Sequence, residues 1–116
     1  MTKDQNDQLA RIATALGFTV VSRSPARYGN DWGRLELLPP NSGEEFSWNP
    51  LTHAGDRYEL IKKLGMAVDF SGELAVAKLD SLRVTFSQSA DSEPEAIVGL
   101  ADQWAQTVLR AKGILD

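Results

Sequence analysis

The sequence predicts an α+β fold in which a mostly antiparallel four-stranded sheet is sandwiched by helices. Three observations predict it: an amphipathic helix pattern near each end of the chain, a third one at its centre, and paired strand patterns between them. Helices that bury one stripe and strands that bury one face pack together as layers. The expected order is therefore helix, two strands, helix, two strands, helix.

The first helix is expected over about Lys3–Leu16. Thr2 followed by Gln5 fits a capping box, in which each side chain bonds an orphan amide at the helix start. The predicted buried stripe consists of Leu9, Ile12, Ala13 and Leu16. Phe18–Ser22 and Arg34–Leu38 follow; their β-branched residues and their alternation predict the first two strands.

The central stretch, Trp48–Gly65, has the pattern of a loop that becomes an amphipathic helix. Asn49-Pro50 favours a turn or an extended backbone, and Thr52 is the expected N-cap. Gly65 is expected to close the helix in the left-handed conformation. The predicted apolar stripe consists of Leu51, Ala54, Tyr58, Ile61 and Leu64.

The second pair of strands is expected over Glu73–Leu79 and Leu82–Phe86, joined as a hairpin at Asp80-Ser81. A short extended piece, Met66–Phe70, is expected to precede them. The closing helix is predicted to begin after Ser92, which forms a capping box with Glu95, and to stop at Gly113. Its predicted buried stripe consists of Ile97, Leu100, Ala101, Trp104, Val108 and Ala111.

A length of 116 residues predicts one domain over residues 1–116, and 42% apolar residues can build its core without disulfides or metal. The chain has no cysteine, which excludes disulfides, thiol chemistry and zinc-finger sites. Twelve basic against sixteen acidic residues leave a net charge of −4, so nucleic-acid binding through phosphate neutralisation is not expected. No apolar run reaches the length of a membrane span, and a cytoplasmic protein without membrane contact is expected.

Residues 48–65 resemble a motif of small, uncharacterised phage and prophage proteins of the "phage ABA sandwich" domain type. The residues that carry the resemblance are Trp48-Asn49-Pro50-Leu51-Thr52, Gly55-Asp56, Leu60 and Lys63-Leu64-Gly65, and Glu95–Ala101 is similar to the start of the family's closing helix. The chain departs from the family at His53 and Ala54, where acidic residues are common, and at Tyr58, where a small residue is usual. The resemblance implies an α/β sandwich and a phage or prophage origin, and it implies no activity.

His53 is the only histidine, and Asp56 three residues later could orient it as a general base. A histidine in the first turn of a helix is more often a capping or surface residue. The sequence has no serine in a nucleophile elbow, no array of carboxylates and histidine at metal-ligand spacing, and no phosphate-binding loop. We therefore predict no catalytic residue, no cofactor and no metal site.

A binding site is expected instead, formed by aromatic and basic residues around two loops. Tyr, Trp and Arg bury large areas at interfaces while keeping polar groups. The alternative for Trp48 is that it fills the core edge together with Phe46 before the central helix. The candidate residues are Arg27, Tyr28, Trp32, Arg34, Trp48 and His53.

These residues indicate a non-enzymatic protein-binding module, encoded by a phage or prophage, that docks on a host or phage protein. Inhibition of a host defence system or another host factor is the sharper form of this hypothesis. One alternative is a nucleic-acid-binding accessory protein that stacks bases on the Arg/aromatic loop. A second alternative is a small enzyme using His53. A monomer or a homodimer is expected.

Overall fold

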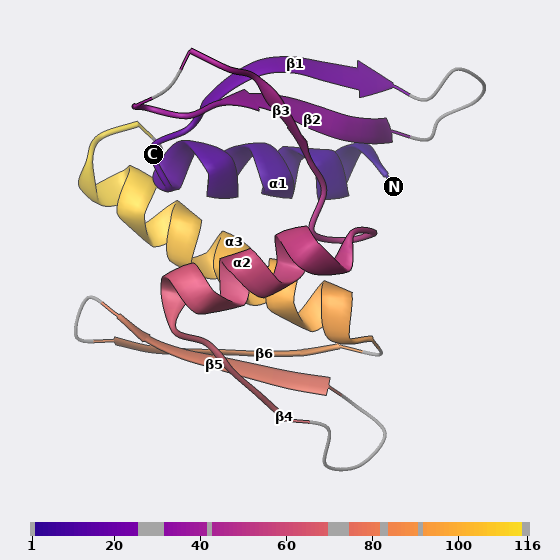
Figure 1. The fold of residues 1–116 in the computed structure, drawn as a ribbon. Coiled ribbons are helices and arrows are strands. Elements are labelled where there is room, and N and C mark those ends of the chain that lie inside the picture. Colours follow the sequence, from indigo (N-terminus) through magenta and orange to yellow (C-terminus); the bar gives the residue numbers. More distant parts are fainter. Residues whose placement is uncertain are drawn as a thin grey trace. The chain divides into compact units, whose positions relative to one another are not determined.

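The computed structural model describes residues 2–25, 32–41, 43–69, 75–81, 84–90 and 92–114, and over these residues it contains three helices and six strands (Figure 1). The elements in chain order are α1 (Lys3–Ala15), β1 (Thr19–Pro25), β2 (Trp32–Leu38), β3 (Phe46–Trp48), α2 (Ala54–Leu64), β4 (Ala67–Asp69), β5 (Ala75–Ser81), β6 (Val84–Ala90) and α3 (Glu93–Ala111). The protein is therefore α+β, as the sequence predicts.

The predicted four-stranded sheet is wrong. The strands form two antiparallel three-stranded sheets, with orders β1-β2-β3 and β4-β5-β6. The difference comes from β3 and β4, which have three residues each. A strand this short shows too little alternation to be assigned to a sheet from the sequence, and pairing with a longer neighbour stabilises it.

Contacts divide the chain into two compact units. The first consists of residues 1–49 and 105–116, and the second of residues 50–104, so that α3 contributes to both. Each unit contains one of the two sheets. The single domain expected over residues 1–116 stays a prediction.

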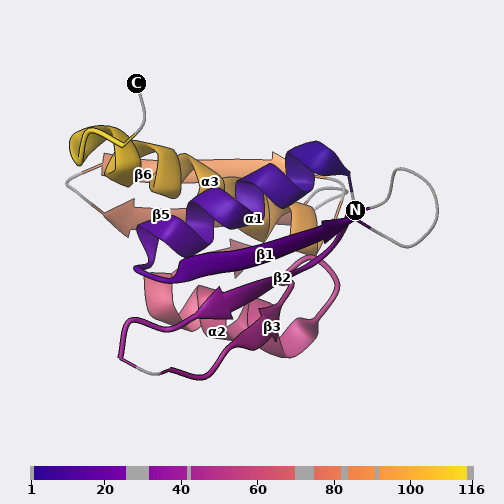
Figure 2. The ribbon, with the colours of Figure 1, turned by 90° about the horizontal axis from the view of Figure 1, so that it is seen from above.

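In the first unit, α1 lies along one face of the sheet β1-β2-β3, whose strands lie side by side in Figure 2. The capping box of Thr2 and Gln5 is confirmed, since each side chain bonds the other residue's amide, at 2.9 and 3.1 Å. Leu35 and Leu37 point into the core from alternate positions of β2. Phe18 meets Phe46 edge to face, with ring centroids 5.5 Å apart. The residues of α1 that are buried are Asn6, Leu9, Ile12, Ala13 and Ala15.

Helices α1 and α2 each end at a glycine and lead into a strand, and the two junctions have the same geometry. Gly17 and Gly65 have φ angles of 95° and 69°, in the left-handed region that disfavours residues with a Cβ. The amides of Phe18 and Met66, one residue later, donate to carbonyls five residues back, at 3.0 and 3.1 Å. These bonds satisfy carbonyls that the helix end would leave unpaired. The prediction that Gly65 closes the central helix is confirmed.

In the second unit, the sheet β4-β5-β6 turns one face to solvent. Ala67, Lys78 and Ser87 form one row across the three strands, and all three are exposed. Phe86 and Gln88 alternate with Ser87, and Phe86 is buried. The predicted hairpin is confirmed, but β5 extends through Ser81, which pairs with Val84, so its connection lies at residues 82–83, outside the described ranges.

Helix α3 is tied to β6 through a pair of glutamine side chains. Gln103 donates to the Ser87 carbonyl at 3.2 Å and also to the side-chain oxygen of Gln88. Gln88 in turn donates to the Ser89 carbonyl at 3.1 Å. These bonds hold the Gln88 side chain directly beside Gly99 of α3. The contact is close: a Cβ added at Gly99 would lie 3.0 Å from Gln88 Cγ.

The predicted stripe of α3 is right in its first turns and wrong at its end. Ile97, Leu100 and Ala101 are buried, whereas Ala111 is exposed. Burial extends beyond one stripe, and a helix that is covered on more than one side no longer shows a narrow apolar stripe. The buried residues that the stripe omitted are Ala96, Val98, Asp102, Ala105 and Leu109.

Replacement of Gly99 by alanine tests the contact with Gln88. Alanine in a helix interior is more favourable than glycine by about 1 kcal/mol. We expect Gly99→Ala to give no gain in the free energy of unfolding, because the new Cβ displaces Gln88 from its hydrogen bonds. In a Gln88→Ala background the same substitution should stabilise by about 1 kcal/mol. Urea unfolding measures both; an equal gain in the two backgrounds would contradict the contact.

Candidate functional site

The structure describes the predicted site residues unequally. Arg27 and Tyr28 lie outside the described residues. Trp32 and Arg34 belong to β2, and the structure describes their backbone. Trp32 pairs with Pro25 of β1. Trp48 and His53 are described with their side chains, and they lie in very different environments.

Trp48 belongs to the core. It is 6% exposed in β3, where it pairs with Leu35 of β2, which is fully buried. This placement is the alternative that the sequence left open, in which Phe46 and Trp48 fill the core edge. So little of the indole is accessible that it offers almost no surface to a partner.

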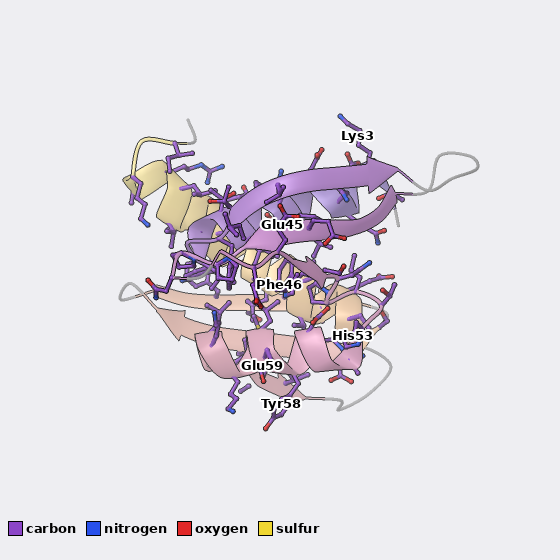
Figure 3. All side chains as sticks on the ribbon, turned by 45° about the horizontal axis from the view of Figure 1, so that its top comes forward. Lys3, Glu45, Phe46, His53, Tyr58 and Glu59 are labelled. Carbon is purple, nitrogen blue, oxygen red and sulfur yellow. The ribbon has the colours of Figure 1, made fainter. Side chains whose placement is uncertain are left out.

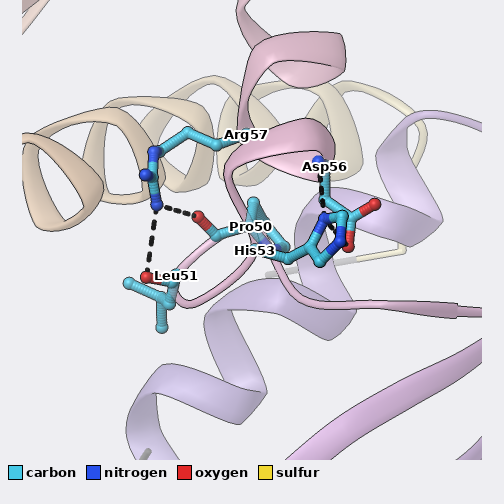
Figure 4. Close-up of polar contacts among 5 residues, drawn as sticks. All are labelled: Pro50, Leu51, His53, Asp56 and Arg57. Carbon is cyan, nitrogen blue, oxygen red and sulfur yellow. Dashed lines mark hydrogen bonds and ion pairs between the residues drawn. The ribbon is translucent and has the colours of Figure 1, made fainter.

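His53 is the N-cap of α2. Its backbone is extended, and its Nδ1 accepts a hydrogen bond from the Asp56 amide at 3.2 Å (Figure 4). The prediction that Thr52 is the N-cap is wrong. With Thr52 as N-cap the helix would begin at residue 53, but it begins at Ala54. The His53 imidazole therefore accepts from the free amide of the first turn, in place of the Thr52 hydroxyl.

The His53 ring lies at the surface beside a carboxylate. Its side chain is 70% exposed, and its Nδ1 lies 3.6 Å from Oδ2 of Asp56. Gly55 leaves the space that the ring occupies, since a Cβ there would lie 3.1 Å from Cε1 and 3.3 Å from Nδ1 of His53. The Nδ1 atom that caps the helix must be unprotonated in order to accept the amide proton.

Arg57 holds the turn before α2 to the helix. Its Nη1 donates to the carbonyls of Pro50 and Leu51, at 3.1 and 3.3 Å, and the side chain is partly buried (Figure 4). These bonds satisfy a charged group on the inner side of the helix. Leu60, three residues further along, is 2% exposed and marks the centre of that inner side.

The opposite side of α2 faces solvent, which contradicts the predicted apolar stripe. Tyr58 is 61% exposed and Ala54 is exposed, although the sequence assigned both to the buried side. Figure 3 shows Tyr58 and Glu59 projecting away from the helix. We define the outer face of α2 by its exposed residues, which are Ala54, Gly55, Tyr58, Glu59, Lys62 and Lys63.

The outer face of α2 combines an aromatic ring with charges of both signs. Lys62 Nζ lies 5.9 Å from the centroid of the Tyr58 ring, within the range of a cation–π contact. Glu59 precedes Lys62 and Lys63, so that the acidic residue lies nearer the helix start and the basic residues near its end. A tyrosine among long charged side chains can bury its ring against a partner while its hydroxyl stays hydrogen-bonded.

Tyr58 was not among the candidate binding residues of the sequence, because its side chain was counted as apolar. The distribution of charge gave no warning, because charged residues occupy positions 56, 57, 59, 62 and 63 and leave the predicted stripe free of charge; the signal lay in the side chains themselves. The hydroxyl of tyrosine favours solvent or a polar partner, whereas Leu60 has no polar atom. Giving Leu60 priority over Tyr58 would have set the rotation of α2 correctly.

In the ranges given above, no three histidine or acidic side chains come together in a group that could hold a metal ion. None of the helices there has an apolar stretch long enough to cross a membrane.

Comparison with models of known protein families gave no match, and comparison with curated proteins gave none either.

The His53 cap can be tested through its coupling to Gly55. His53→Ala should lower the free energy of unfolding by about 1 kcal/mol, because the Asp56 amide loses its acceptor, and His53→Asn should largely restore it. Gly55→Ala should stabilise more in the His53→Ala background than in the wild type, since the ring no longer meets the added Cβ. Thermal and urea unfolding give the values; additive effects of the two substitutions would refute the coupling.

Proposed function

We propose that the protein is a non-enzymatic protein-binding module that contacts its partner through the outer face of α2. The observation that carries the proposal is the exposure of Tyr58, a large aromatic side chain at the middle of a solvent-facing helix. Tyrosine is enriched among the residues that contribute most binding energy at protein interfaces. Its ring has few rotatable bonds, so it loses little conformational entropy on binding.

The rigid attachment of α2 supports this proposal. His53 caps the helix start, Arg57 ties the preceding turn to it, and Gly65 closes its end. A surface held in this way is ordered before it meets a partner, which lowers the entropic cost of association. The outer face of α2 therefore has the properties of a preorganised contact surface.

The proposed partner is a protein of a bacterial host or of a phage. This rests on the resemblance of residues 48–65 to small phage and prophage proteins, which supports a phage or prophage origin and action in the host cytoplasm. Inhibition of a host defence system or another host factor is the sharper proposal. Tyr58 and His53, at which the chain departs from that family, both belong to α2 or its cap and would give this chain a contact surface of its own.

Tyr58→Ala should weaken partner capture strongly. Removal of a central tyrosine commonly costs 2 kcal/mol or more, which corresponds to a loss of about 30-fold in affinity. The measurement is a pull-down from host lysate at moderate salt, read by mass spectrometry, followed by titration of the purified partner. Tyr58→Phe, which keeps the ring, should retain most of the affinity.

Two control variants make the outcome specific. Lys78→Ala alters an exposed side chain on the sheet of the same unit and should leave capture unchanged. A Tyr28→Ala/Trp32→Ala variant tests the loop that the sequence favoured. Loss of capture in that variant but not in Tyr58→Ala would move the contact surface to the loop and overturn our assignment.

A further inference from the structure

We propose that the outer face of α2 also pairs with the same face of a second copy of the chain, with the two helices antiparallel. This inference rests on the proposed function in one respect, namely that the outer face of α2 is a contact surface. It goes further by naming one partner and one geometry. The observations that carry it are the order of charges along the face and the position of Tyr58 beside them.

The charges on this face match the charges on the same face of a second copy when the two helices run in opposite directions. The point midway between Leu60 and Ile61 is also midway between Glu59 and Lys62. Along the helix axis, each of the two charged residues lies about 2 Å from this point. A twofold axis through that midpoint brings Glu59 opposite Lys62 of the second copy, and Lys62 opposite Glu59 of the second copy. A symmetric dimer makes every such contact twice.

A parallel arrangement lacks this match. It would bring Glu59 against Glu59 and Lys62 against Lys62, and like charges in contact are unfavourable. The antiparallel arrangement also sets the positive start of each helix dipole near the negative end of the other. The charge order therefore selects one orientation out of the two.

Tyr58 lies next to these charges and gains a second cation in the antiparallel pair. Lys62 already lies 5.9 Å from its ring within one chain. In the dimer, Lys62 of the second copy comes to lie beside the same ring, where desolvation strengthens a cation–π contact. Ala54, one turn before Tyr58, has a small exposed side chain that allows the end of the second helix to approach.

The size of the surface sets the expected strength. A helix of 11 residues is about 16 Å long, so one pair of such helices buries less than the roughly 1,200 Å² typical of stable specific complexes. We therefore expect a reversible dimer with a dissociation constant in the micromolar range, present at high concentration and dissociated on dilution.

Charge reversal tests the geometry. Sedimentation velocity of the purified protein from about 10 μM to 1 mM should show a monomer–dimer equilibrium. Glu59→Lys and Lys62→Glu should each weaken it about tenfold, because each substitution turns two attractive contacts into repulsive ones. The double variant Glu59→Lys/Lys62→Glu should restore the wild-type constant to within about threefold. Thermal unfolding confirms that each variant is folded.

Mixing the two single variants gives the most specific result. A Glu59→Lys chain presents two lysines and a Lys62→Glu chain presents two glutamates, so their antiparallel pair regains both contacts and should associate more tightly than either variant alone. Glu45→Lys and Lys78→Glu change the net charge by the same amounts at exposed positions outside α2 and should have no such effect.

Three results would overturn the inference: a wild-type protein that stays monomeric to 1 mM, a dimer that is indifferent to the reversals, or single variants that do not associate when mixed. Its failure is distinguishable from failure of the proposed function. If the dimer is absent but Tyr58→Ala still abolishes capture of another protein, the outer face of α2 serves that protein alone. If Tyr58→Ala changes neither the dimer dissociation constant nor the capture of another protein, the outer face of α2 is not a contact surface.

Discussion

The burial of Leu60 sets the rotation of α2, and the candidate site follows from that rotation. Leu60 is 2% exposed, whereas Tyr58, two residues earlier and about 200° around the helix, is 61% exposed. The helix cannot bury both. Leucine has no polar atom to satisfy, so its burial costs nothing beyond side-chain entropy, whereas the tyrosine hydroxyl would need a partner inside the protein. Tyr58, Glu59 and Lys62 therefore face outward as a consequence of packing on the other side.

Hydrogen bonds offset the cost of burying polar groups in this orientation of α2. Arg57 lies on the inner side, where an unpaired guanidinium would be costly, and the carbonyls of Pro50 and Leu51 satisfy it. His53 caps the first turn through a ring that lies close against Gly55, where a Cβ would be 3.1 Å from its Cε1 atom. The same local interactions that order the helix thus also order the surface that it presents.

Local signals in the sequence predicted the three helices and several of their ends, but not the start of α2. The Thr2–Gln5 capping box and the closure at Gly65 are both present, because each depends on residues within a few positions of one another. The short strands β3 and β4 were not predicted as members of sheets, since their stability comes from neighbours that are distant in sequence. The sheets therefore differ from the prediction in number and in size.

The candidate site was less predictable than the fold. Trp48 was taken as a binding residue and is buried, whereas Tyr58 was taken as a core residue and is exposed. In both cases an amphipathic aromatic side chain suits either environment, and the deciding contacts are tertiary. The helix cap at His53 could have been inferred only from the start of α2 at Ala54, which propensity alone did not locate.

The most direct test of this account is thiol labelling of single-cysteine variants, because the natural chain contains no cysteine. Tyr58→Cys and Leu60→Cys are compared under native conditions with a water-soluble maleimide, each against its own rate in denaturant. We expect the cysteine at position 58 to react nearly as fast as in the unfolded chain, and the cysteine at position 60 to be protected at least tenfold. Equal rates, or protection at position 58, would contradict the orientation of α2 on which the proposed contact surface depends.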